Sequence, residues 1–412
     1  MASLPTAQPR AHTWQPMSAL FGGVVLMTTA TVAASTMGTL VAGDVAGPAL
    51  SGVPNAAGVL GTAIGTTWLS VVVTRHGRRS GLLVGYVCAM LGAVTAAAGA
   101  GLADLLLLIP GMVLLGIGNG AAQLGRYVAG DLYPPDRRSA ALGVIVWGGT
   151  AGALAGPALI TVSDSAAGRA GLPPAVGPYL LALTAAALGV VITGSLVGPG
   201  RGTSRTSTSA STSAERITTL LRLPMVAVAL SSMIAGQVAM VAVMTMTPLE
   251  MHISGHGLGS VSAILTAHMI GMFALSPLTG RITGRFGGVR TAFAGLITLA
   301  VSALAACTAP GGVDSPVSFV ALFLLGYGWN LTFIGGSSLL SARLPEASRT
   351  RLQGAVDGLA WTASALASIG AGLLMAASTY TVLAAVVAVA LIVPATLIVV
   401  AARRGVLVTQ TP

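Results

Sequence analysis

The sequence predicts an all-α integral membrane protein whose twelve transmembrane helices form two six-helix pseudo-repeats. Three observations predict this fold. The 412 residues are 54% hydrophobic and only 7% charged, with a mean hydropathy of +0.88, which is too apolar for a soluble domain. Apolar stretches of about 20 residues recur, the length that a helix needs to cross the hydrocarbon core. Short polar turns recur at an offset of 210 residues: Arg75 matches Arg285, and Gly77 matches Gly287.

The apolar stretches divide the chain into twelve spans. In the first half we place them at 18–42, 54–73, 80–101, 105–130, 140–162 and 177–198. In the second half we place them at 224–249, 258–283, 290–309, 316–342, 351–376 and 379–402. None alternates polar and apolar residues as a β-barrel strand does. The run from Met17 is too long for a signal-peptide core, so it is interpreted as a retained span.

The spans group into two bundles joined by a linker. We expect an N-terminal six-helix bundle in 1–200 and a C-terminal six-helix bundle in 224–412. Between them, 201–223 begins with a run of Ser, Thr and Arg that cannot bury enough apolar area to fold. This segment is therefore predicted to be a cytoplasmic linker.

The arginines predict the orientation of the chain. All 20 basic residues are Arg, and 18 of them fall in alternate turns on one side of the predicted membrane. Of the other two, Arg169 lies on the opposite side and Arg126 lies inside the fourth span. Because cytoplasmic turns carry the excess of positive charge, we expect both termini and the linker to be cytoplasmic, in a cell membrane.

Composition and motifs exclude several other classes. The net charge of +10 comes from arginines scattered over many turns, so it does not form a nucleic-acid-binding face. Cys88 and Cys307 both fall in apolar spans and indicate no disulfide framework. No phosphate-binding Walker loop is present, so ATP drive and a bound cofactor are not indicated.

Twelve spans in a six-plus-six repeat, with a central linker and a basic turn after span 2, resemble the major facilitator superfamily of secondary transporters. The family turn reads G-x-x-x-D-R-x-G-R-R, and this chain matches it at its arginines and at its turn glycine. The matching residues are Arg75, Gly77, Arg78 and Arg79, whereas Ser70 and Thr74 replace the leading glycine and the acid. The turn from Asp131 to Arg138 also looks like the family's turn after span 4.

Span 5 is similar to the antiporter motif G-x8-G-x3-G-P-x2-G-G of the drug/proton exchanger branch. Its first four fixed positions hold Gly143, Gly152, Gly156 and Pro157. Closely packed glycines with a proline can set a bend between helices, although tight packing alone also explains glycines in a span. The family also has an arginine inside span 4. In this chain Met112 occupies that position, and Arg126 lies nearly four turns further along.

Polar residues inside spans should face the protein interior or a wet cavity, because lipid offers them no partners. The resemblance implies that spans 1, 4, 7 and 10 line a central cavity. The cavity candidates are Asn119, Gln123, Gln237, Trp329 and Asn330. Hydrogen bonding between helices explains the amides equally well. Glu250, His252 and His256 are a weak candidate metal cluster, and no metal site is predicted.

Three further residues could couple or latch the transport cycle. Arg126 is the first of them. His268 is the second, and it could carry protons, with a packed neutral ring as the alternative. Asp357 could also titrate, or it could pair with Arg75 or Arg78 across the halves and supply the charge that Thr74 lacks. An unpartnered acid in a span is costly, about 2.5–3.5 kcal/mol.

We therefore expect a monomeric secondary transporter, not an enzyme, that moves a small organic solute by alternating access, by proton-coupled efflux. Its other partners would be protons and the lipid bilayer, with no nucleic acid. Proton-coupled uptake of a metabolite is the alternative. From a different class, a membrane sensor would be expected to carry an added soluble domain, and an intramembrane enzyme would need a catalytic cluster.

Overall fold

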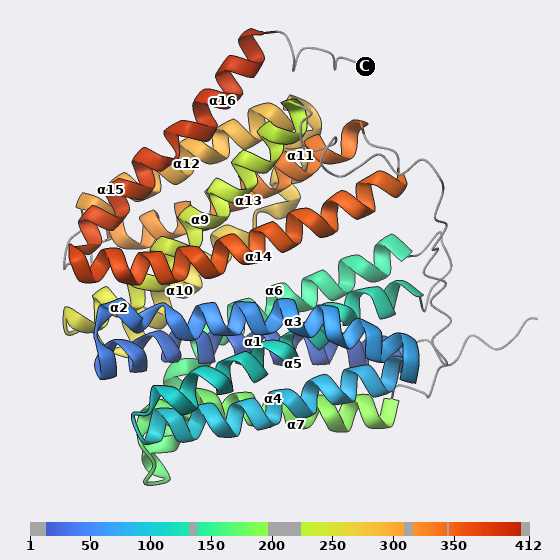
Figure 1. The fold of residues 1–412 in the computed structure, drawn as a ribbon, viewed down its shortest axis with the longest axis vertical. Coiled ribbons are helices and arrows are strands. Elements are labelled where there is room, and N and C mark those ends of the chain that lie inside the picture. The colour runs from blue at the N-terminus through green and yellow to red at the C-terminus, as the bar shows by residue number, and fades with distance from the viewer. Residues whose placement is uncertain (1–13, 132–137, 197–223, 309–315, 344–345, 405–412) are drawn as a thin grey trace, which may run out of the picture.

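A computed structural model describes residues 14–131, 138–196, 224–308, 316–343 and 346–404 (Figure 1). Within these ranges, twelve helical stretches are long and apolar enough to cross a membrane, which confirms the predicted fold class and number of spans. The predicted linker, 201–223, lies outside the described residues. The side chains of Arg126, Asp131, Arg138 and Asp357 do as well, although their backbones are helical.

The first half contains seven α-helices and one 3₁₀ turn among the described residues. They are α1 (Trp14–Ala46), α2 (Pro48–Ser51), α3 (Val53–His76), α4 (Arg78–Gly101), α5 (Leu105–Asp131), α6 (Arg138–Arg169), η2 (Pro174–Val176) and α7 (Gly177–Leu196). The helix α6 continues past the predicted end at residue 162, because hydropathy marks the apolar part of a helix and not its last hydrogen bond.

The described part of the second half contains eight helices. They are α9 (Pro224–Ile253), α10 (Leu258–Phe273), α11 (Ser276–Phe286), α12 (Gly288–Thr308), α13 (Pro316–Arg343), α14 (Glu346–Ala377), α15 (Tyr380–Ala390) and α16 (Ile392–Arg403). Figure 1 shows the two sets of helices as two groups, with α3 of the first beside α14 of the second.

The turns that carry the repeat have the same conformation in both halves. Gly77 follows α3 with φ 90° and ψ 165°, and Gly287 follows α11 with φ 85° and ψ 156°. Glycine adopts positive φ at little cost, so both helices can end sharply here. Each glycine N–H donates to the carbonyl four residues earlier, on Val73 and Thr283, which are again 210 residues apart.

The same offset governs how the helices pack. A Cβ atom on Gly116 of α5 would overlap the Gly58 carbonyl of α3, and one on Gly326 of α13 would overlap the His268 carbonyl of α10. Small residues let helix backbones approach in lipid, where dispersion and hydrogen bonding drive association. Each half is therefore organised by the same close contacts between its helices.

Two spans of the second half are broken where their counterparts in the first half are continuous. Span 8 divides into α10 and α11 ahead of Pro277, and span 12 divides at Leu391 ahead of Pro394. Proline has no N–H and clashes with the preceding turn, so it can interrupt a helix. The corresponding spans 2 and 6 run through as α3 and α7.

Candidate functional site

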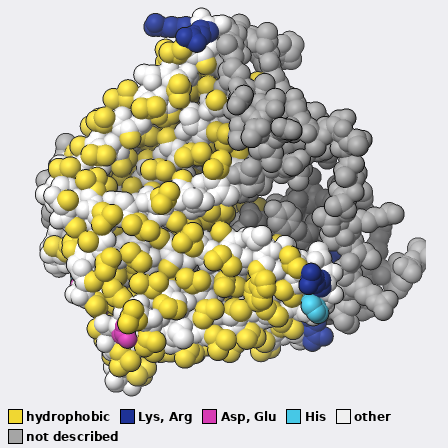
Figure 2. Space-filling view, in the orientation of Figure 1, with side chains coloured by type: hydrophobic (Ala, Val, Ile, Leu, Met, Phe, Trp, Pro, Cys, Tyr) yellow, Lys and Arg dark blue, Asp and Glu magenta, His cyan; other side chains and the backbone are white. Residues whose placement is uncertain are grey.

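The molecule has two ends, and the halves meet differently at each. We call the end where α1 ends and α3 begins the distal end, and the end where α3 ends and α9 begins the linker end. The helices α3 and α14 lie side by side at the distal end and diverge toward the linker end (Figure 1). Figure 2 shows hydrophobic side chains over most of the described part of this face. The described contact between α3 and α14 is therefore at the distal end.

Polar side chains join the halves near the distal end. Asn55, in the first turn of α3, accepts a hydrogen bond from Ser35 Oγ of α1 at 2.6 Å. Its amide nitrogen donates to Ser368 Oγ of α14 at 3.0 Å and to Thr245 Oγ1 of α9 at 3.4 Å. We call Ser35, Asn55, Thr245 and Ser368 the distal seam. Because these groups lie within the membrane-spanning helices, little water competes for their hydrogen bonds.

The backbones also approach closely at the distal seam. Ser368 Oγ donates to the Gly52 carbonyl at 2.9 Å, and a Cβ atom on Gly52 would overlap the Ser368 carbonyl. One turn further along α14, a Cβ atom on Gly372 would lie 2.8 Å from the Pro48 carbonyl. Larger residues at these two glycines would hold the halves apart.

The last two turns of α9 extend the contact outward. Thr245, Leu249 and His252 share one face of this helix, because they are four and three residues apart. Leu249 packs against Gly43, and His252 Nε2 lies 3.2 Å from Asp44 Oδ1 at the end of α1. The His252 and Asp44 side chains are 42% and 60% exposed, so their pair is accessible to solvent.

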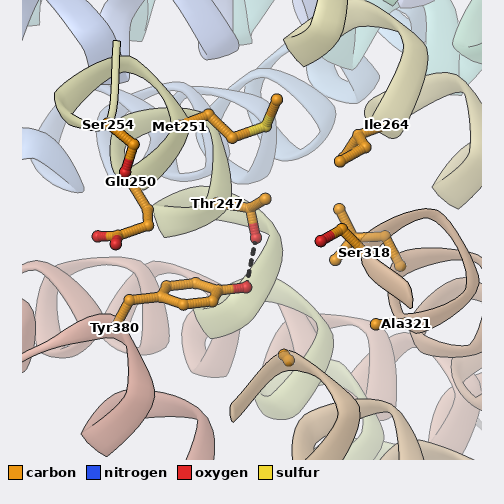
Figure 3. A pocket seen from close by; sticks show the side chains of 10 residues that line it. Thr247, Glu250, Met251, Ser254, Ile264, Ser318, Ala321 and Tyr380 are labelled. Atoms are coloured by element: carbon orange, nitrogen blue, oxygen red, sulfur yellow. Dashed lines mark hydrogen bonds between the residues drawn. The ribbon is translucent and has the colours of Figure 1, made fainter. Parts of the chain in front are cut away.

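The opposite face of the same α9 segment lines a cavity inside the second half (Figure 3). Thr247 Oγ1 and Tyr380 OH are 2.8 Å apart at its centre. Glu250 and Ser254 lie toward one end and Ser318 toward the other. The cavity volume of about 40 Å³ has room for about two or three water molecules.

The three residues named as a weak metal candidate, Glu250, His252 and His256, do not form a cluster. Glu250 faces the cavity, His252 faces Asp44, and His256 Nδ1 lies 3.2 Å from the Met251 carbonyl oxygen. The three side chains thus have three different surroundings. Among the described residues, no group of three His, Cys, Asp or Glu side chains is placed to hold a metal ion.

A second polar group lies between the helices α9, α13 and α14, where the sequence predicted cavity residues. The Gln237 amide of α9 donates to Ser364 Oγ at 2.7 Å and accepts a hydrogen bond from Trp329 Nε1 at 2.6 Å. The Trp329 ring stacks on Phe333, with centroids 5.0 Å apart and planes inclined by 14°. Phe273 meets Trp329 edge-on at 6.3 Å. We call Gln237, Phe273, Trp329 and Phe333 the aromatic wall.

The aromatic wall faces the other half of the molecule. On α13, Gly326 contacts α10, Gly328 contacts α12 and Gly336 contacts α9. The remaining sector between α9 and α10 carries Trp329 and Phe333, because they are three and seven residues from Gly326 on a 3.6-residue helix. Trp329 also belongs to a cluster with Met240 and Met272 that includes Ala153 of α6, from the first half.

The helix α5 carries amides at the equivalent positions. Subtracting the offset of 210 from Trp329 and Phe333 gives Asn119 and Gln123. Asn119 is buried, and its Nδ2 donates to Thr62 Oγ1 of α3 at 3.3 Å. Gln123 is partly exposed. Related positions on the two halves thus carry aromatic rings on one side and amides on the other.

Comparison with known proteins decides the family. A profile of the Major Facilitator Superfamily matches residues 19–368. The chain belongs to the Major Facilitator Superfamily. It is therefore a multi-pass cell-membrane transporter and not an enzyme. Its placement in the drug/proton exchanger branch stays a prediction.

Relatives of the superfamily chain extend over most of its length. It is 32% identical to the uncharacterized MFS-type transporter YdeG of Bacillus subtilis over 373 residues, which cover 88% of the chain and 85% of that relative. It is 28% identical over 333 residues to the riboflavin transporter RfnT of Brucella anthropi, covering 80% and 81%. A crystal structure of a POT family transporter in complex with a thioalcohol conjugated peptide covers 96% of both chains, with a TM-score of 0.71 and 15% identity. This last likeness concerns the fold alone.

The superfamily motifs predicted from the sequence lie at the linker end and on α6. In the basic turn, Arg75 is exposed, whereas Arg79 donates to the Gly194 carbonyl of α7. The turn is thus tied to its own half. Any pairing of Arg78 or Arg75 with Asp357 falls outside the described side chains and stays a prediction.

The glycines of the exchanger-like motif pack against α1. A Cβ atom on Gly152 would lie 2.5 Å from the Val25 carbonyl oxygen, and one on Gly156 would lie 2.7 Å from Val32 Cβ. Gly143, by contrast, has open space where a side chain would point. Pro157 lies inside α6, which continues through it. The motif therefore holds α6 against α1 in this structure.

Two other candidates lie at contacts between α10 and α13. Asn330 Nδ2 donates to the Met272 carbonyl at 2.7 Å and to Ser276 Oγ at 2.8 Å, across the break between α10 and α11. It thereby satisfies a carbonyl that the broken helix leaves without its usual partner. His268 is fully buried, with Nδ1 3.1 Å from the Leu322 carbonyl oxygen.

Sequence reasoning missed the distal seam and part of the aromatic wall. Asn55 is a polar residue at the start of a predicted span, so the rule applied to Asn119 could have identified it. The serines Ser35, Ser364 and Ser368 had no such signal, because serine often bonds to its own helix. Phe273 and Phe333 look like ordinary apolar residues of a span.

Proposed function

We propose that this superfamily member is a secondary active transporter that moves a small organic solute by alternating access, with the linker end in the cytoplasm. The proposal rests on the distal seam. The halves are joined near the distal end and diverge toward the linker end, and residues that can bind a solute lie between them. The arginine distribution supports the orientation. In this orientation the distal seam would close the path from outside.

Alternating access requires the contacts of the distal seam to break and re-form in each cycle. Hydrogen bonds between helices in membranes contribute about 0.6 kcal/mol on average, so a few such bonds can hold one state without locking it. The close approaches at Gly52 and Gly372 add packing that depends on the same geometry. Rocking of one half against the other would separate both kinds of contact together.

We further propose that transport is proton-coupled efflux. The exchanger-like motif in α6 supports this direction, because it resembles the motif of the exchanger branch and two of its glycines, Gly152 and Gly156, pack against α1. The relative named as a riboflavin transporter supports a small organic solute as cargo. Glu250, His268 and Asp357 are ionisable residues within spanning helices and are candidates for carrying the proton.

Flux through liposomes tests the proposal. The purified protein would be reconstituted and loaded with a panel of small organic solutes, and their exit measured with an imposed pH gradient of either sign. We expect flux that depends on the gradient and is lost in Gly52→Leu, which wedges the distal seam. Equal flux in both gradients would contradict proton coupling, and flux only in the uptake direction would contradict efflux. If no solute moves in any gradient, the transport proposal fails.

Orientation is tested separately in intact cells. With Cys88 and Cys307 replaced, a single cysteine is placed at Ser207 or at Thr409. We expect no labelling by a membrane-impermeant thiol reagent until the cells are opened. Ready labelling from outside would reverse the proposed orientation.

A further inference from the structure

We propose that the solute is a planar heteroaromatic compound that stacks on the aromatic wall while its polar edge bonds to the amides of the first half. This inference rests on the proposed transport function and adds the chemical class of the cargo. Its basis is the pair of stacked rings on α13 together with the amides at the equivalent positions on α5.

The aromatic wall offers a stacking surface. Phe333 lies nearly parallel to Trp329, yet the Phe333 side chain is still 39% exposed. It lies in the α13 sector between α9 and α10, so this exposed surface faces the space between the halves and not the lipid. Flat rings bind such surfaces by stacking, an interaction that tolerates different ring systems because each has a π-face.

Hydrogen bonds hold the Trp329 ring in place before any solute arrives. Its Nε1–H is bonded to Gln237, whose own amide is bonded to Ser364 on α14. Phe273 packs edge-on against the same ring from α10. The ring is therefore fixed from three helices. A fixed surface loses little conformational entropy on binding, so more of the stacking energy remains as affinity.

The equivalent positions of the first half carry polar side chains without charge. Asn119 and Gln123 occupy on α5 the places that Trp329 and Phe333 occupy on α13, and amides can both donate and accept hydrogen bonds. None of these four residues is ionisable. A solute whose ring carries carbonyl and N–H groups along one edge matches this arrangement, whereas a strongly charged solute would lose hydration with no counter-charge from these residues.

Binding to the purified full-length chain in lipid nanodiscs tests the proposal. The planar probes are riboflavin and adenine, and the non-planar probes are sorbitol and alanyl-alanine. We expect at least one planar probe to bind and both non-planar probes to bind much more weakly. Trp329→Ala should weaken planar binding about 10- to 100-fold, as loss of one stacking contact does. Phe333→Leu should weaken it about 10-fold, and Trp329→Phe less than Trp329→Ala.

Matched controls separate stacking from folding. Trp147 of α6 is 69% exposed and lies outside the aromatic wall, so Trp147→Leu should leave planar binding unchanged. Each variant is compared by its melting temperature without probe. Should Trp329→Ala unfold, Phe333→Leu still decides, because its ring is partly exposed and its loss leaves the Gln237 bonds intact.

Two results would overturn the inference: tighter binding of the non-planar probes, or unchanged planar affinity in a folded Phe333→Leu variant. Liposome flux of a non-planar solute would then show that the chain is a transporter of another chemical class. Failure of every probe to bind, together with flux of none, would overturn the proposed function as well.

Discussion

The two halves of the molecule share one framework and differ in what they carry on it. Gly116 and Gly326 make the same close helix contact, and Gly77 and Gly287 make the same turn. At one pair of equivalent positions, however, the first half has the amides Asn119 and Gln123 where the second half has Trp329 and Phe333. The two halves have the same residue where helix backbones touch, because only small residues fit there. They have different residues where a solute would be contacted.

The halves also differ in how their helices join. Gly156 of α6 packs against α1, whereas the residue 210 positions later, on α14, is Leu366, which is 67% exposed. Spans 8 and 12 are broken while spans 2 and 6 are continuous. The first half is thus joined more tightly at its α1–α6 contact, and the second half contains the interruptions. We infer that the second half changes shape more during the cycle.

The largest effect is expected from a substitution that removes this difference between α6 and α14. Gly156→Leu gives the first half the residue of the second, and its side chain would meet Val32 of α1. We expect transport to be abolished while membrane insertion remains, because the added bulk separates two packed helices. Liposome flux and the amount of protein in the membrane are the two measurements.

The matched control for this change is Gly143→Leu. Gly143 belongs to the same motif, but no atom lies within 4 Å of its Cβ direction. We expect near-normal flux. Normal flux in Gly156→Leu at wild-type abundance would mean that the α1–α6 contact has no mechanistic role.

A smaller effect is expected where the unlike halves meet. Gly372→Ala places a methyl group 2.8 Å from the Pro48 carbonyl oxygen, whereas Gly370→Ala, on the same helix, points into open space. We expect the first change to open the distal end and to lower flux about tenfold. Labelling of a cysteine at Ser35 by an impermeant reagent measures the opening. Equal labelling in both variants would refute the role of this close approach.

The hydrogen bonds of the distal seam should contribute less. Asn55→Ala, Ser368→Ala and the double variant form a thermodynamic cycle on the open–closed equilibrium, read from the same labelling. We expect a coupling energy of about 0.6–1.7 kcal/mol, the range for such bonds in membranes. Additive effects would mean that the 3.0 Å contact does not stabilise the closed distal end.

The smallest effect is expected at the exposed pair of Asp44 and His252. His252 Nε2 lies 3.2 Å from Asp44 Oδ1, and both side chains are accessible to solvent. A contact between exposed polar side chains contributes less than about 1 kcal/mol, because water competes for both groups. Asp44→Ala should therefore increase distal labelling only slightly, measured with the cysteine at Ser35. An increase as large as that in Gly372→Ala would contradict this ranking.

Local patterns in the sequence predicted the twelve spans, the six-plus-six repeat and the basic turns, because hydropathy and charge are properties of each short segment. Prolines show the limit of such patterns. Pro110, Pro157 and Pro248 lie inside continuous helices, whereas Pro277 and Pro394 follow breaks. A proline always removes a backbone donor, but neighbouring helices decide whether the freed groups find other partners.

The candidate site shows the same division. Polarity within spans identified Asn119, Gln123 and Gln237 as cavity candidates, since lipid leaves such residues few places to go, and their role in binding a solute stays a prediction. Only the tertiary structure joined Asn55 to Ser368 across 313 residues, and Gln237 to Trp329 across 92. The sequence by itself determined which segments enter the membrane, through the cost of leaving polar groups in hydrocarbon. The tertiary structure decided which faces of those helices meet, because that depends on contacts between residues that are distant along the chain.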